Sequence, residues 1–209
     1  MLKSILLLGA WLAATIPAAA TPATPAPTRS CHLPGVEEAL RCLTLPVPLE
    51  PGKPATLNLH VTIAPALRQG ARPDPLFVLA GGPGEAGSDV LPLLSTAFKR
   101  VRATRDIVFV DQRGTGLSGK LECPSDADAD AQLSDADADA ALRRCIAASK
   151  APFAAYTTAA AARDIESVRR ALGYDRINLW GGSYGTRLAQ AASLAHWANS
   201  WSSAAWLSR

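Results

Sequence analysis

The sequence has few charged residues, and only one apolar run in it is long. Charged residues make up 19% of the 209-residue chain, and 21 basic against 18 acidic residues leave a net charge of +3. This small excess gives no support for a nucleic-acid partner. The 48% hydrophobic content excludes disorder for most of the chain. A single long apolar run also excludes a polytopic membrane protein.

Metal-binding patterns are absent from the cysteines and histidines. The four cysteines contain no C-x-x-C pair, and the histidines are His32, His60 and His196. We therefore expect no metal site and no cofactor.

Residues 125–140 contain an Asp/Ala repeat, SDADADA, in two copies. A calcium loop would need glycine at its sixth position and glutamate at its twelfth, where Ala131 and Asp137 stand. We interpret the segment as a solvated, weakly ordered insertion.

Two further glycine patterns resemble nucleotide-binding motifs but fail in detail. Residues 82–87 spell G-x-G-x-x-G, yet Pro83 removes an N–H from the phosphate cradle. Residues 114–120 spell G-x-x-x-x-G-K, yet Leu121 stands where Ser or Thr must bind magnesium. Neither pattern predicts a nucleotide site.

The amino terminus has the pattern of a secretory signal peptide over residues 1–20. Lys3 provides a positive end, residues 5–16 are almost wholly apolar, and residues 18–20 form a small-x-small site. We expect cleavage there, export to the periplasm or the extracellular space, and no membrane span afterwards. An uncleaved anchor is the alternative, but the run is shorter than the ~20 residues of a spanning helix. Residues 21–30 are typical of a Pro-rich linker with no capacity to pack.

Export makes disulfides the favoured state of the four cysteines. Three pairings are possible in an oxidising compartment, and we favour the local ones, Cys31–Cys42 and Cys123–Cys145. Four buried thiols are the alternative. Each disulfide would stabilise the fold by about 2–4 kcal/mol.

Buried strands alternate with helical stretches along the chain. Apolar patterns predict strands over residues 57–63, 76–79, 107–110 and 177–180. Helical spacing is found over residues 90–101 and 158–172. The alternation predicts an α/β fold with a doubly wound, mainly parallel sheet. In such sheets active sites lie beyond the carboxyl ends of the strands.

Residues 181–185 (GGSYG) contain G-x-S-x-G directly after a predicted strand and directly before a helix-forming stretch. This is the context of a nucleophile elbow, in which Ser183 sits on a sharp, strained turn. The helix amino terminus there favours negative charge. One oxyanion-hole N–H would come from Tyr184, and the other from residues 81–84. The alternative is a tight turn with an incidental serine.

Three motifs together resemble a known family. Residues 81–84 (GGPG), 111–118 (DQRGTGLS) and 181–186 (GGSYGT) are similar to the prolyl iminopeptidase and tripeptidyl aminopeptidase branch of the α/β-hydrolases. The resemblance runs from about Cys31 to Leu188, with the motifs in order and at fitting spacings.

The resemblance implies Ser183 as the nucleophile and the N–H groups of Gly82 and Tyr184 as the oxyanion hole. It also implies a structural loop beside the site, in which Arg113 holds architecture rather than substrate. The loop contains Asp111, Gln112, Arg113 and Gly114. Prolyl iminopeptidases usually have histidine where this chain has Ala80, which favours similarity to the secreted tripeptidyl aminopeptidases.

Parts of a catalytic triad are missing. The order in this fold is nucleophile, acid, histidine, but after Ser183 there is no Asp or Glu and the only histidine is His196. We interpret residues 31–209 as the N-terminal portion of an α/β-hydrolase domain, truncated after the elbow. Residues 189–209 form an atypical tail, rich in Ser and Trp. We hypothesise that the chain leaves its ancestral reading frame soon after Leu188; a buried helix is the alternative.

The sequence therefore predicts an exported serine hydrolase of aminopeptidase type. It would cleave N-terminal residues from peptides, or act on another small acyl substrate, through an acyl-serine intermediate. As this chain it would be weakly active or inactive, because a serine without a base is a poor nucleophile. An esterase or other acyl hydrolase is one alternative. A non-catalytic remnant or binding module is another.

Overall fold

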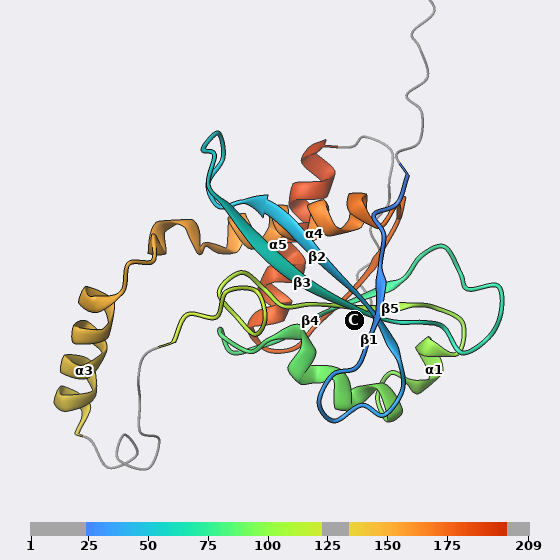
Figure 1. Ribbon diagram of the computed structural model, residues 1–209, viewed down its shortest axis with the longest axis horizontal. Helices are drawn as coiled ribbons and strands as arrows, with labels where there is room; N and C mark the ends of the chain where they lie inside the picture. Colours follow the sequence, from blue (N-terminus) through green and yellow to red (C-terminus); the bar gives the residue numbers. More distant parts are fainter. Residues whose placement is uncertain (1–23, 123–133, 200–209) are drawn as a thin grey trace, which may run out of the picture.

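The computed structural model describes residues 24–122 and 134–199, with side chains as far as residue 194 (Figure 1). The predictions for the signal peptide, for Cys123, for the first copy of the Asp/Ala repeat and for residues 200–209 therefore lie outside the described residues. The side chain of His196 also lies outside them.

A six-stranded sheet forms the centre of the described chain, in the order β1-β2-β3-β5-β4-β6. Three neighbouring strands, β5, β4 and β6, are parallel, as the fold class requires. The other three add on through antiparallel pairs. The strands are β1 (Arg29–Cys31), β2 (Leu40–Pro48), β3 (Thr56–Ala64), β4 (Leu76–Leu79), β5 (Ile107–Val110) and β6 (Asn178–Gly181).

The apolar runs in β4 and β5 are continuous because both faces of the sheet are covered. Successive side chains of a strand point to opposite faces. One set packs with α4 (Thr158–Ala171) and α5 (Tyr184–Asn199). The other set packs with η1 (Gly87–Ser95), a 3₁₀-helix, and with Phe98, which directly precedes α1 (Lys99–Arg102). Figure 1 shows α4 and α5 on one side of the sheet and α1 on the other.

Strand β2 has no counterpart among the predicted strands. It contains Pro46 and Pro48, which argue against a central strand. Its pairing explains why they are tolerated: β3 pairs with all of residues 41–48, but β1 pairs only with residues 40–42. Beyond Cys42 one side of β2 is an open edge, where a missing N–H removes no ladder hydrogen bond.

The helix predicted over residues 90–101 is broken in two. Pro92 lies inside η1, and it cannot donate a hydrogen bond to the preceding turn. The segment ends with N–H groups of Thr96 and Phe98 both bonded to Leu93 O, at 3.2 and 3.1 Å. The short α1 follows as a separate helix.

The second copy of the Asp/Ala repeat is helical, so the expectation of weak order is wrong there. Helix α3 (Asp135–Ala148) contains it, and none of the helix's residues is buried. Ser134 caps the helix by accepting a hydrogen bond from Asp137 N at 3.3 Å. Asp135 and Asp137 lie in the first turn, where the helix dipole favours acids, and alanine favours the helix throughout.

The described part of the Pro-rich segment packs against the domain, contrary to the expectation of an unpacked linker. Ala26 N donates to Ala171 O at 2.6 Å, and β1 begins at Arg29. A disulfide joins Cys31 in β1 to Cys42 in β2. Cys145 is also disulfide-bonded. The segment is held because the strand and the disulfide that follow it fix its path.

Truncation of Leu59 tests where the core lies. This side chain in β3 is fully buried among the residues that pack against α4 and α5. Leu59→Ala should lower the free energy of unfolding by about 2–5 kcal/mol, measured by urea denaturation. Leu67→Ala is the matched control, because Leu67 is 61% exposed, and it should change stability by less than about 0.5 kcal/mol. Equal losses in the two variants would contradict this packing.

Candidate active site

Ser183 lies on a sharp turn between a strand and a helix. Strand β6 ends at Gly181, and α5 begins at Tyr184. Ser183 has φ 49°, the one positive φ among the described non-glycine residues. Such a backbone costs about 1–3 kcal/mol and persists only where its surroundings enforce it. Hydrogen bonds from Thr186 N and Thr186 Oγ1 to Ser183 O, at 3.0 and 2.7 Å, help to hold the turn.

Two glycines allow this turn to sit against the sheet. A Cβ at Gly185 would lie 2.1 Å from Leu79 O, at the end of β4. A Cβ at Gly181 would lie 2.3 Å from Gly185 O. Both separations are below any real contact, so a side chain at either position would push α5 away from the strands. The turn is closed further by Gly182 N, which donates to Leu79 O at 3.2 Å.

The loop of residues 81–84 lies beside Ser183. A Cβ at Gly81 would be 3.2 Å from the Ser183 Cβ, so the loop backbone reaches the nucleophile position directly. In the described part of the chain, neither Gly82 N–H nor Tyr184 N–H donates a hydrogen bond to another residue. Both amides predicted for the oxyanion hole are therefore available.

Asp111 organises the loop that follows β5. It is 1% exposed, and its carboxylate accepts hydrogen bonds from Ser88 N at 2.8 Å and from Leu117 N at 2.9 Å. Its backbone carbonyl accepts from Ser118 Oγ at 2.7 Å, and Ser118 Oγ in turn accepts from His60 N at 2.8 Å. Asp111 therefore fixes loop geometry and is not free to act in chemistry.

Gln112 and Gly114 extend this loop. Gln112 Nε2 donates to Ala80 O at 3.1 Å, directly before the glycine-rich loop of residues 81–84. Gly114 N donates to Ser118 O at 3.0 Å, which closes the turn. The predicted structural loop thus touches the predicted oxyanion loop through one amide side chain.

Arg113 forms a buried ion pair with Asp164 in α4. Its Nε and one terminal nitrogen each lie 2.7 Å from a carboxylate oxygen, and the two side chains are 4% and 5% exposed. The other terminal nitrogen donates to Ala155 O at 2.7 Å and to Leu49 O at 3.0 Å. With its donors used in this way, Arg113 links α4 and two loops to the sheet and does not face the site.

No base for Ser183 is found among the described side chains. Ser183 Oγ has no hydrogen-bond partner there. His60 is buried in β3, where its Nε2 lies 3.1 Å from Thr62 Oγ1. Burial lowers the pKa of His60, against the opposing charge of Asp111. The described residues also contain no cluster that could hold a metal ion.

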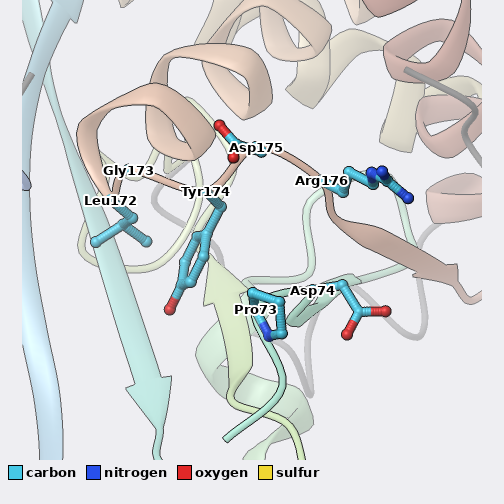
Figure 2. Close-up of a pocket in the computed structure, with 7 residues that line it drawn as sticks. All are labelled: Pro73, Asp74, Leu172, Gly173, Tyr174, Asp175 and Arg176. Carbon is cyan, nitrogen blue, oxygen red and sulfur yellow. The ribbon is translucent and has the colours of Figure 1, made fainter. Parts of the chain in front are cut away.

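A cavity of about 610 Å³ lies at the opposite end of β6 from Ser183 (Figure 2). It is lined by residues before β4 and between α4 and β6, namely Pro73, Asp74, Leu172, Gly173, Tyr174, Asp175 and Arg176. Burial, together with the charge of Asp106, raises the pKa of Tyr174 to about 12. The amino ends of parallel strands are not where active sites of such sheets lie, so we do not assign the chemistry to this cavity.

The comparison with known families agrees with the elbow geometry. Residues 74–204 match the model of the alpha/beta hydrolase fold family. The chain belongs to the α/β-hydrolases. The match extends past Leu188, and α5 runs unbroken through that point to Asn199.

Named relatives of this α/β-hydrolase include a protease. This chain is 34% identical over 133 residues to the serine protease Hip1 of Mycobacterium tuberculosis and of Mycobacterium bovis. The aligned region is 56% of this chain, which spans only 26% of those relatives.

The chain is also similar to parts of solved structures of other hydrolases. Proline iminopeptidase from Mycobacterium smegmatis aligns with TM-score 0.45 and 21% identity, over 73% of this chain and 40% of that chain. A putative epoxide hydrolase from Pseudomonas aeruginosa aligns with TM-score 0.43 and 22% identity, over 78% and 38%.

Three side chains near the site were not identified from the sequence. Glu85 folds back onto the glycine-rich loop, where its Oε2 accepts a hydrogen bond from Gly81 N at 2.7 Å. Thr158 Oγ1 lies 2.8 Å from Tyr184 OH. Asp164 pairs with Arg113 across 51 residues. An acid in the middle of an amphipathic helix was the only available signal for Asp164.

Removal of Arg113 should destabilise the domain strongly. Arg113→Met leaves Asp164 buried without its partner, which should lower the free energy of unfolding by about 3–5 kcal/mol. Arg143→Met is the control, because the Arg143–Asp139 pair is exposed; a helical pair of this kind contributes only about 0.3–0.5 kcal/mol. Chemical denaturation measures both variants. Similar small losses in the two would show that Arg113 does not brace the fold.

Proposed function

We propose that the chain carries the nucleophile half of an exported serine hydrolase, with Ser183 as the nucleophile. The observation that carries the proposal is the positive φ of Ser183, on a turn that two glycines allow to contact the sheet. A strained serine has a structural cost without a packing benefit, so its presence supports a role in chemistry. The turn also exposes the hydroxyl, because Ser183 lies on the surface.

Gly82 and Tyr184 would supply the oxyanion hole. Their N–H groups have no acceptor in the described chain, and the glycine-rich loop touches the serine position. Each such donor contributes about 3–4 kcal/mol to stabilising a tetrahedral oxyanion. The amino terminus of α5 adds a favourable field at the same place.

Peptides are the proposed substrates, cleaved at their amino ends. The similarity to a serine protease supports amide rather than ester hydrolysis. The GGPG, DQRG and GGSYG motifs support the aminopeptidase type by resemblance. Export is supported by the Cys31–Cys42 disulfide, since disulfides persist in oxidising compartments.

Turnover by this chain alone should be slow. After Ser183 the sequence has no Asp or Glu that could orient a histidine base. Enzymes that lose triad members retain only about 10³–10⁴-fold acceleration over water, from the oxyanion hole and substrate binding. We therefore separate the reactivity of the serine from turnover of a peptide.

A fluorophosphonate tests the nucleophile. Attack by Ser183 Oγ on phosphorus expels fluoride, and the hydroxyl proton passes to solvent, which leaves a covalent adduct. Intact-mass spectrometry should show one adduct on the folded chain, and peptide mapping should place it on Ser183. The unlabelled chain should hydrolyse peptides slowly, and the labelled chain should hydrolyse them no faster.

Two serine variants make the test specific. Ser183→Ala should abolish the adduct, whereas Ser193→Ala should keep it. Ser193 lies on α5, where its hydroxyl only donates to Ala189 O. A chain that unfolds cooperatively in urea yet forms no adduct on Ser183 would refute the proposed nucleophile.

A further inference from the structure

Glu85 places a carboxylate beside the nucleophile. Its Oε2 accepts a hydrogen bond from Gly81 N at 2.7 Å. A Cβ atom added to Gly81 would lie 3.2 Å from Glu85 Oε2. It would also lie 3.2 Å from Ser183 Cβ. The carboxylate and the serine thus lie against the same small stretch of backbone. Both residues are exposed, so a substrate that reaches Ser183 also reaches Glu85.

This carboxylate has no cationic partner within the described ranges. No salt bridge involves Glu85 there, and its one hydrogen bond is to the Gly81 amide. Two other acids near the site have different partners: loop amides donate to Asp111, and Arg113 pairs with Asp164. Glu85 is therefore a negative charge beside Ser183 that no salt bridge of the described residues compensates.

Glu85 is not placed against the serine hydroxyl as a general base would be. No hydrogen bond joins its carboxylate to the serine hydroxyl, and its Oε2 is held by Gly81 N–H on the loop side. A negative charge beside a forming oxyanion also opposes reaction, unless a positive charge lies next to it. A neutral substrate would meet this repulsion, whereas a cationic substrate would cancel it.

We propose that Glu85 binds the ammonium group at the amino terminus of the peptide that acylates Ser183. This assignment rests on the proposed function, and it names the feature by which the site would prefer free over blocked amino termini. The attraction acts on the incoming ammonium, and the same charge disfavours substrates that lack it. Glu85 is then a specificity residue, since discrimination uses both the favourable contact and the penalty on competitors.

The test compares two fluorophosphonates that differ only in charge. One carries a two-carbon arm that ends in trimethylammonium, and the other carries the isosteric arm that ends in tert-butyl. The second-order rate of adduct formation on Ser183 is measured for each by intact-mass spectrometry. The wild-type chain should react about fivefold faster with the cationic probe, the upper end for an exposed ion pair. High salt should reduce this preference by screening.

Glu85→Gln removes the charge and keeps a side-chain oxygen that can accept the Gly81 N–H. It should abolish the preference for the cationic probe while still allowing the neutral probe to react. Asp89→Asn is the matched control. Asp89 accepts a hydrogen bond from Ala86 N at 2.9 Å, and asparagine can do the same. This variant loses the same charge in the neighbouring turn and should keep the preference.

The outcomes separate the two proposals. Labelling of Ser183 with equal rates for both probes, or a preference that survives Glu85→Gln, would leave the nucleophile in place and overturn the role of Glu85. A loss of labelling with both probes in Glu85→Gln would indicate a purely structural role and would also overturn it. If a folded wild-type chain reacts with neither probe, the proposed nucleophile fails, and the role of Glu85 fails with it.

Discussion

The close approach of the α5 amino terminus to the end of β4 is the constraint on which the site depends. Contact at Leu79 O is possible because Gly185 has no side chain, and Gly181 clears the same space from the strand side. With helix and strand this close, the connecting residue takes a positive φ, and that residue is Ser183. The sheet below must therefore be rigid enough to hold a strained turn.

Buried polar contacts supply that rigidity around the apolar core. Arg113 joins the loop after β5 to α4 through Asp164, and α4 packs beside α5. Asp111 holds the same loop to η1 through Ser88, and Gln112 reaches Ala80 at the start of the glycine-rich loop. The DQRG stretch thus connects both halves of the proposed site without entering it. The contacts of this stretch are architectural, and the proposed chemistry rests on the backbone amides and the serine.

The sequence predicted what local patterns control. Solid apolar runs predicted β4 and β5 because strands covered on both faces lose their polar alternation, and G-x-S-x-G after a strand predicted the turn at Ser183. Partners distant in the chain could not be predicted. The fold of Glu85 onto Gly81 depends on a loop path that an exposed acid does not encode. Strand β2 escaped prediction because its prolines are tolerated only where β1 stops pairing.

A crystal structure of the fluorophosphonate adduct would test the central claim most directly. The account predicts phosphorus bonded to Ser183 Oγ, with the phosphoryl oxygen accepting hydrogen bonds from the N–H groups of Gly82 and Tyr184. Ser183 should keep its positive φ in the adduct, because the glycine contacts that enforce it do not change. A phosphoryl oxygen that points to solvent, with both amides bonded elsewhere, would contradict the account.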